Sequence, residues 1–408
     1  MLVMEMSNKK QQIPAIRFKG FTDAWEQRKL GDIADIKDSA RISNELWVEN
    51  GIPYLRSSDL VNGELNGELF ISKETYEGYA SKTGAPQKDD VLFTSGGKVG
   101  VVYHKKDESP VYVQGGAVLY VKTSTSNLLD GSFLSIYFGS PRMQTYMDIA
   151  SSGGTIKHFT LKPANASPII FPGLSEQQKI GAFFKELDKT IALHQRQSDT
   201  YKELKKSMLQ KMFPQDGEKV PEIRFDGFTE EWERRSLNSI VKRVTRKNKN
   251  LESSLPLTIS AQHGLVDQNT FFNKQVASKD VSGYYLVKKG EFAYNKSYSS
   301  GYPWGAIKRL DNYDKGVLST LYIVFKPKKI ESDFLMSYYD TNFWHKEVSV
   351  RAAEGARNHG LLNISAQDFF ETELIIPIKP EEQSKIGAFF KQLDETITLH
   401  QQALDKLN

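Results

Sequence analysis

An internal repeat constrains this 408-residue chain more than any other feature of its sequence. Residues 14–33 and 221–240 are identical at twelve of twenty positions, and residues 176–195 and 382–401 at sixteen of twenty. The two offsets, 207 and 206 residues, are nearly equal. The chain therefore consists of two copies of one unit, each ordered as a repeated box, a variable region and a second repeated box that forms a helix.

The two variable regions, about 34–173 and 241–378, resemble each other much less than the boxes do. Both contain short β-branched and aromatic runs between Gly, Asn, Asp and Ser residues, together with helical stretches, which predicts a mixed α/β or α+β fold. We expect one domain fold with diverged loops. The predicted organisation is an N-terminal extension (1–13), a first domain (14–174), a spacer helix (175–213), a linker (214–220), a second domain (221–380) and a C-terminal spacer helix (381–408).

The repeated second box has helical periodicity. Its apolar positions step alternately by four and three residues, which is typical of a coiled-coil seam. We expect the two helices to pack on each other, although an amphipathic helix that packs on its own domain is the ordinary alternative. His194 and His400 fall on this seam, where a mutual polar contact would fix the register. The predicted seam residues are Ile180, Phe184, Leu187, Ile191, His194 and Tyr201 in the first helix and Ile386, Phe390, Leu393, Ile397, His400 and Leu404 in the second.

The direction of the two helices follows from the reach of the chain. A helix over 175–213 is about 58 Å long at about 1.5 Å per residue. The linker 214–220 spans at most about 25 Å at roughly 3.5 Å per residue, so the second domain must start near the far end of the first helix. The second helix then runs back, which predicts an antiparallel pair with pseudo-twofold symmetry and one domain at each end.

Composition excludes several classes of function. The chain has no cysteine, so disulfides, thiolate metal sites and cysteine nucleophiles are excluded, and a reducing cytoplasm is its natural compartment. No apolar run approaches a membrane span, and the first residues do not form a signal peptide. No nucleotide-binding or hydrolase motif is present, and the seven histidines form no cluster, so we expect no catalytic residue and no metal site. The net charge of +4 permits an acidic partner without requiring one.

The polar loops of the variable regions have the chemistry that DNA binding needs. Lys and Arg suit phosphates, Arg, Asn, Ser and Thr suit base edges, and Gly allows close backbone approach. Each loop alone is weak evidence, because charge runs are usually solvated surface, Gly-Gly-Lys is usually a turn, and a structural role is open for His158 and His359. The candidates are Arg56, Ser57, Ser58, Thr94, Ser95, Lys98, Thr155, Lys157 and His158 in the first region and Arg246, Lys247, Lys249, Lys296, Ser297, Tyr298, Arg351, Arg357, Asn358 and His359 in the second.

Three motifs carry a resemblance to a known family. They are the duplicated P-x-I-R-F-x-G-F-T-x-x-W-E-x-R box, the helix E-Q-x-K-I-G-A-F-F-K-x-L-D-x-T-I-x-L-H-Q and the strand V-L-F-T-S-G-G-K-V-G. Together they resemble the DNA-specificity (S) subunit of Type I restriction-modification systems over essentially the whole chain. The resemblance implies two target recognition domains, each reading half of a split DNA sequence, and a spacer that docks two modification (methyltransferase) subunits.

The resemblance also implies a chain without a catalytic centre or cofactor of its own. Its modification partners would bring S-adenosylmethionine and methylate adenine, and restriction (nuclease and translocase) subunits would add ATP- and magnesium-dependent cleavage. One departure is that residues 204–213, which continue the first helix, have no counterpart after the second box, which puts the symmetry of subunit docking in doubt. The alternatives are a self-contained DNA-modifying enzyme and a coiled-coil scaffold that does not bind DNA.

Overall fold

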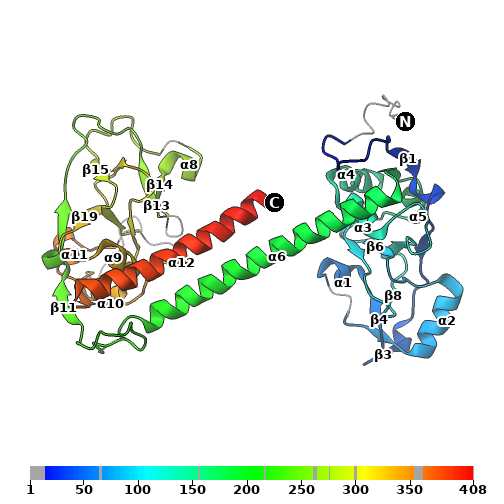
Figure 1. Cartoon of the computed structure of the whole chain (residues 1–408), viewed down its shortest axis with the longest axis horizontal. Coiled ribbons are helices and arrows are strands. Elements are labelled where there is room, and N and C mark those ends of the chain that lie inside the picture. The colour runs from blue at the N-terminus through cyan, green and yellow to red at the C-terminus, as the bar shows by residue number, and fades with distance from the viewer. Residues whose placement is uncertain are drawn as a thin grey trace. The chain divides into compact units, whose positions relative to one another are not determined.

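The computed structural model describes residues 14–63, 67–154, 157–215, 217–260, 264–274, 276–297, 301–352 and 362–407. The chain divides into two compact units, Met1–Thr190 (unit 1) and Ile191–Asn408 (unit 2). The uninterrupted helix α6 (Leu174–Lys211) begins in unit 1 and ends in unit 2 (Figure 1). Within the described ranges, no helix is both long enough and apolar enough to cross a membrane.

Unit 1 is built on strand pairs that join distant parts of the sequence. Its first repeated box pairs with the segment just before α6, through β1 (Glu26–Lys29) and β10 (Pro168–Phe171) in antiparallel register. One four-stranded antiparallel sheet has the order β2 (Ile36–Asp38), β9 (Val118–Val121), β6 (Val91–Thr94) and β7 (Val102–His104). A second sheet has the order β3 (Trp47–Val48), β5 (Phe70–Ile71), β4 (Ile52–Leu55) and β8 (Tyr112–Val113).

Helices cover the first of these sheets, and polar caps start several of them. Asp130 accepts a bond from the backbone N–H of Phe133, and Ser140 one from Met143, so that α3 and α4 follow each other directly. Phe93 of β6 then packs edge-to-face on Phe138 of α3. The helices of unit 1 are α1 (Ser57–Val61), α2 (Lys73–Thr83), α3 (Gly131–Gly139), α4 (Pro141–Ala150) and α5 (Leu161–Asn165), with short 3₁₀ turns η2 (Leu30–Asp32) and η3 (Asn44–Leu46).

Unit 2 repeats this frame. Its main sheet has the order β12 (Val241–Val244), β19 (Ile323–Pro327), β16 (Phe292–Asn295) and β17 (Ala306–Arg309), which is the order found in unit 1. The other strand pairs are β11 (Glu233–Ser236) with β20 (Glu373–Ile376), β13 (Leu257–Ser260) with β14 (Gly264–Asp267), and β15 (Tyr285–Lys288) with β18 (Lys315–Leu318). The helices are α7 (Leu237–Ile240), α8 (Gln268–Phe272), α9 (Ser332–Tyr339), α10 (Trp344–Arg351), α11 (Ala366–Phe370) and α12 (Pro380–Leu407). The predicted mixed fold with an internal repeat is confirmed.

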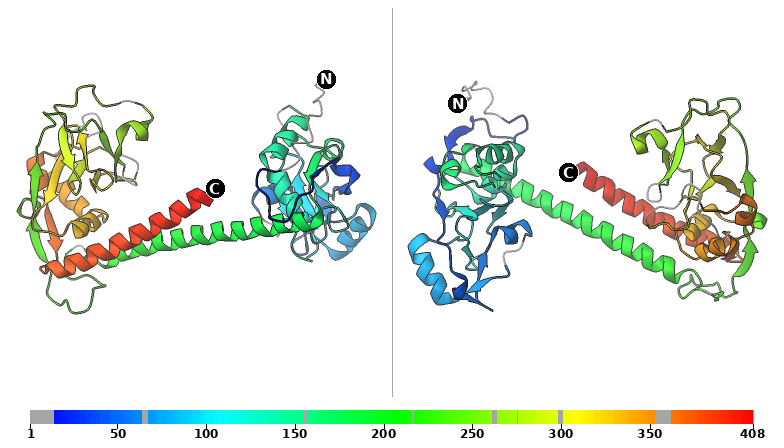
Figure 2. Two further views of the ribbon diagram at one scale, coloured as in Figure 1. Left: turned by 45° about the horizontal axis from the view of Figure 1, so that its top comes forward. Right: turned by 180° about the vertical axis from the view of Figure 1, so that it is seen from behind.

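Within unit 2, α12 runs antiparallel to the second half of α6 (Figure 2). The Nδ1 atoms of His194 and His400 lie 3.0 Å apart, and the ring of Tyr201 stacks on His400. Farther along α6, Lys205 pairs with Asp394 at 2.7 Å. As the residue numbers rise on α6 they fall on α12, so the predicted direction is correct.

Candidate nucleic-acid interface

Two candidate loops of unit 1 lie side by side at the end of β6. The backbone N–H of Phe159 donates to Ser95 O at 2.7 Å, and Gly96 forms a β-bridge with His158. Ser152 and His158 exchange backbone hydrogen bonds of 3.0 and 2.8 Å, which close the loop between them. The side chains of Lys98, Lys157 and His158 are all exposed on these loops.

Two glycines allow this close approach. A Cβ atom on Gly96 would lie 3.1 Å from His158 Nδ1, tighter than ordinary packing. Gly97 has a φ of +75°, a left-handed conformation that favours glycine, and Ser57 at the start of α1 lies beside it. The segment Arg56–Ser58 therefore joins the same surface as the two loops.

Two of the candidates on this surface do not present their side chains to solvent, which corrects the sequence prediction. Thr94 is 0% exposed and Ser95 3% exposed. The hydroxyl of Thr94 donates to Lys98 O at 2.5 Å and accepts from the N–H of Val101 at 3.0 Å. The strand β6 is covered on both faces, so its last residues shape the turn instead of reaching a ligand.

Ion pairs already engage two other candidates of unit 1. Arg56 Nη2 lies 3.0 Å from Asp59 Oδ1 and 2.7 Å from Glu68 Oε2, and these hydrogen bonds raise the pKa of Arg56 above its usual value. Lys157 pairs with Asp148 across an exposed surface. A phosphate group would have to compete with these carboxylates, although exposed pairs such as Lys157–Asp148 are weak.

In unit 2 the equivalent strand end is arranged in the same way. The N–H of Leu362 donates to Lys296 O at 2.9 Å, as Phe159 does to Ser95 in unit 1. Lys296 Nζ donates to Ile364 O at 3.1 Å, and the half-buried Ser297 follows it. Arg351 pairs with Glu347 at 2.5 Å at the end of α10. The candidates Thr155, Tyr298, Arg357, Asn358 and His359 lie outside the described residues.

The basic segment after β12 is partly engaged within its own domain. Arg246 donates from Nη2 to Glu291 at 2.7 Å and to Leu286 O at 3.0 Å. Lys247 donates to a backbone carbonyl and lies 4.3 Å above the ring of Tyr285. Lys249 is exposed. Of these three candidates, Lys249 has the most accessible side chain.

The sequence analysis identified the repeated boxes but not the Arg–Glu ion pair that connects the two boxes within each repeat. Arg17 clamps Glu176 through two bonds of 2.7 Å, and Arg224 clamps Glu382 through bonds of 2.6 and 2.8 Å. These hydrogen bonds raise the pKa of both arginines above its usual value. Each glutamate is buried in the first turn of α6 or α12, so the clamp fixes each long helix to its own domain. The identity of these residues in both repeats was the signal that could have identified them.

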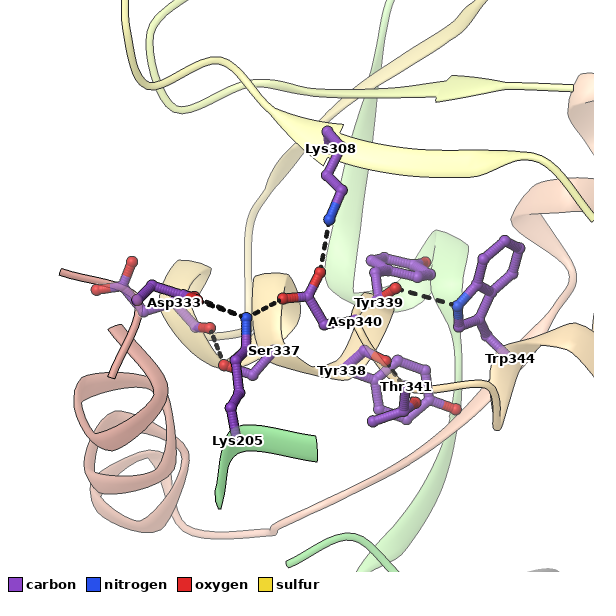
Figure 3. A network of polar contacts seen from close by, with 10 residues as sticks. Lys205, Lys308, Asp333, Ser337, Tyr338, Tyr339, Asp340, Thr341 and Trp344 are labelled. Carbon is purple, nitrogen blue, oxygen red and sulfur yellow. Dashed lines mark hydrogen bonds and ion pairs between the residues drawn. The ribbon is translucent and has the colours of Figure 1, made fainter. Parts of the chain in front are cut away.

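A second polar network, which the sequence analysis also did not identify, connects α6 to the main sheet of unit 2 (Figure 3). Asp340 accepts from Lys205 Nζ and from Lys308 Nζ of β17, at 2.7 Å each. Burial alone would raise the pKa of Asp340, but the charges of Lys308 and Lys205 lower it below its ordinary value. The carboxylate therefore stays ionised between two lysines.

The predicted seam is only partly formed as expected. Ile386, Phe390 and Leu393 are buried, but in a cluster that includes α9 of their own domain as well as the end of α6. Phe184 is 38% exposed, which contradicts its predicted place in the seam. The described contacts between the helices begin at His194, whereas Phe184 lies in unit 1. The remaining seam positions, half-buried except for the buried Leu404, are Ile180, Leu187, Ile191, His194, Tyr201, Ile397, His400 and Leu404.

The chain matches one protein family twice. The family model of the Type I restriction modification DNA specificity domain matches residues 22–203 and 229–408. The S subunit of a Type I restriction-modification system from M. genitalium superposes with a TM-score of 0.57 at 15% identity, covering 97% of this chain and 95% of that one. The HsdS subunit of Thermoanaerobacter tengcongensis gives a TM-score of 0.45 at 14% identity, with 94% and 93% covered. No curated protein matches the chain.

Proposed function

Because the chain belongs to the Type I restriction-modification DNA-specificity family, we propose that each of its two recognition domains reads one half of a bipartite DNA target. The duplicated arrangement of the loops is the observation that carries this proposal. In both units a backbone hydrogen bond, from Phe159 to Ser95 or from Leu362 to Lys296, joins a loop to the end of the same strand of the main sheet. One frame therefore presents two different sets of polar side chains, as a reader of two different half-sites requires.

Lys98, Lys157 and His158 are the unit 1 side chains that we assign to DNA, together with Ser57 and Ser58 beside them. Lysines suit phosphate contacts, which supply affinity that falls with salt, while hydroxyl and imidazole groups suit base edges. In unit 2 we assign Lys249, Lys296 and Ser297. The candidates Arg56 in unit 1 and Arg246, Lys247 and Arg351 in unit 2 would each exchange an internal carboxylate or carbonyl for phosphate.

The partners follow from the family. We propose that the repeated helices dock two modification subunits, which bring S-adenosylmethionine and methylate adenine, and that restriction subunits add ATP- and magnesium-dependent cleavage. In this assignment the chain supplies no catalytic residue and holds no cofactor. Its place of action is then the cytoplasm, where the DNA is.

The test uses the chain assembled with the modification subunits of its source. Lys98→Ala and Lys157→Ala should each weaken binding to cognate duplex by roughly tenfold and lower the dependence of log K on log salt by about 1. Lys82→Ala, at an exposed position of α2 away from the helices proposed to dock the modification subunits, is the matched control and should bind like the parent chain.

Mapping methylated adenines gives the second readout. Substitutions at Ser57 or Ser58 should relax the sequence preference of one half-site and leave the other unchanged. Unaltered affinity and methylation in all of these variants would remove the surface from the DNA interface. Methyl transfer by the isolated chain would refute the assignment as a non-catalytic subunit.

A further inference from the structure

A cluster of exposed lysines lies at one end of the main sheet of unit 2. Lys242 on the edge strand β12 and Lys326 on β19 are directly paired in antiparallel register. Lys328 and Lys329 follow β19, and their backbone N–H groups both donate to Ile240 O, at 2.9 and 3.0 Å, just before β12 begins. The lysine cluster is defined as Lys242, Lys326, Lys328 and Lys329, which are all exposed.

The charge of the lysine cluster is not balanced by carboxylates. None of its members has an ion-pair partner among the residues that the structure describes. Like charges that face each other directly across two strands destabilise a sheet. The pairing of Lys242 with Lys326 therefore costs stability in the free chain, and a bound anion would relieve the repulsion.

The equivalent place in unit 1 is built differently. Lys37 of β2 takes the place of Lys242 and faces Tyr120 of β9 across the two strands. In both units the carbonyl group two residues earlier, of Asp35 or of Ile240, accepts the N–H of the neighbouring chain segment. The ammonium group of Lys37 lies 3.5 Å from a carboxylate oxygen of Asp35. The frame that the two units share therefore does not require a pair of lysines at this place.

Protection of a sheet edge explains one of the lysines but not the others. β12 is the edge strand of its sheet, and a charged side chain on an edge strand hinders pairing with another chain. Lys326 lies on the inner strand β19, and Lys328 and Lys329 lie beyond the end of that strand. Edge protection is therefore a sufficient account of Lys242 alone.

The lysine cluster lies away from the loops assigned to DNA in unit 2. Those loops begin at the end of β16, where Tyr294 pairs with Ile323 at the start of β19. Lys326 is three residues farther along β19, which is about 10 Å at roughly 3.3 Å per residue, and Lys328 lies farther still. The loops and the lysine cluster would therefore contact different stretches of a polyanion that binds both.

We propose that the lysine cluster binds the phosphate backbone of duplex DNA beyond the half-site of unit 2, without regard to sequence. This inference rests on the proposed function, since it takes the chain to be a DNA-binding protein. Lysine is depleted in protein–protein interfaces but is a regular partner of phosphate, so DNA fits the lysine cluster better than an acidic protein does. A flanking stretch of the same duplex fits better than a second duplex, because the reading loops hold it at a high effective concentration.

Lys242→Glu tests the proposal because it should change folding and binding in opposite directions. It places a carboxylate opposite Lys326, which removes the repulsion and should raise the thermal midpoint of the full chain. It also removes one cation and engages a second. Affinity for a long fluorescein-labelled random-sequence duplex, followed by anisotropy, should therefore fall at least about tenfold, and the slope of log K against log salt by roughly 2.

Two further variants and a second duplex complete the experiment. Lys326→Ala removes one cation and should lower the salt slope by about 1. Lys106→Glu makes the same change of charge as Lys242→Glu at an exposed position after β7 of unit 1, and as the matched control it should bind like the parent chain. The salt slope of the parent should be larger on the long duplex than on one that only covers the loops, and Lys242→Glu should remove this difference.

The opposite results would overturn the proposal. Unchanged affinity and salt slope in Lys242→Glu would show that the lysine cluster does not contact DNA, and an equal loss in Lys106→Glu would show a general effect of net charge. Equal slopes of the parent on short and long duplexes would exclude a flanking stretch. Two duplexes bound per chain in sedimentation, reduced to one by Lys242→Glu, would make a second duplex the ligand.

The two proposals can be told apart when one of them fails. If Lys98→Ala weakens binding and Lys242→Glu does not, the lysine cluster is excluded and the reading loops stand. A full chain that binds no DNA under any of these conditions would contradict both proposals.

Discussion

Asp340→Asn removes the one carboxylate that two lysines of unit 2 share, while it keeps the shape of the side chain. The side chain of Asp340 is 12% exposed, and those of Lys205 and Lys308 are 17% and 15% exposed. Breaking a buried ion pair by removing one partner costs roughly 3–5 kcal/mol, because it leaves a buried charge uncompensated. Asp394 still faces Lys205 at 2.7 Å, which leaves that lysine one partner. We therefore expect a loss of about 3 kcal/mol, at the lower end of that range.

Hydrogen exchange of the full chain, measured peptide by peptide with mass spectrometry, shows which region loses stability in the Asp340→Asn chain. A destabilisation of about 3 kcal/mol should speed exchange of α9 and α12 peptides by roughly a hundredfold, since 1.36 kcal/mol corresponds to a factor of ten. Peptides from unit 1 serve as the internal reference. Asp199→Asn, which breaks an exposed pair with Lys202 at 4.0 Å, is the matched control and should change exchange less than about threefold.

The dependence on pH gives a second check of the same network. Burial alone would raise the pKa of Asp340, but Lys308 and Lys205 lower it. A carboxylate with a lowered folded pKa stabilises the protein above the pKa of an unfolded Asp, about 3.9, and the contribution is lost as the pH falls through the folded pKa. The difference between parent and Asp340→Asn should therefore be constant from pH 7 to 5 and shrink below about pH 4. Equal exchange in the two proteins at pH 7 would refute the reasoning.

Two further changes test the clamp and the half-buried imidazole of His345. Arg224→Lys should lose the two-point hydrogen bond to Glu382 and speed hydrogen exchange in unit 2 only, by about tenfold. Arg17→Lys should have the same effect in unit 1. Faster exchange in both units after either change would contradict two separate joints. Burial lowers the pKa of His345, so the unfolded chain takes up a proton first and stability falls as the pH drops through about 6.5. His345→Gln should make thermal unfolding less sensitive to pH between 7 and 5, and an unchanged sensitivity would show that the imidazole is not the cause.

The repeat made the fold predictable because identical boxes at equal offsets require identical elements. The contact of His194 with His400 followed from the heptad alone, since both residues occupy one seam. The clamp between Arg17 and Glu176 did not follow, because a pairing across 159 residues leaves no trace in local spacing. Because the same arginine and glutamate recur in the second copy, the sequence indicates that each has a structural role, but it does not show that the two residues pair with each other.

Residue type and periodicity also do not tell what covers a side chain. Thr94 and Ser95 were placed correctly at the tip of a strand, yet burial on both faces of β6 keeps their hydroxyls from solvent. The heptad identified Phe390 as apolar on one face of its helix, but α9 and α6 share that face between them. A helix that packs on its own domain and a helix that packs on another helix have the same pattern, and α12 does both.

The way the loops are attached explains how such a protein can change its target without losing its fold. The clamps, Arg17–Glu176 and Arg224–Glu382, use side chains of the repeated boxes, so replacing these residues would break the joint. The loops are instead held by a backbone hydrogen bond, from Phe159 to Ser95 in unit 1 and from Leu362 to Lys296 in unit 2. Any residue except proline at the donor position can make this bond. Exposed side chains beside these bonds, such as Lys98 and His158, pack little against the core. Substitution at such positions should therefore alter what the surface contacts while the domain and its helix stay in place.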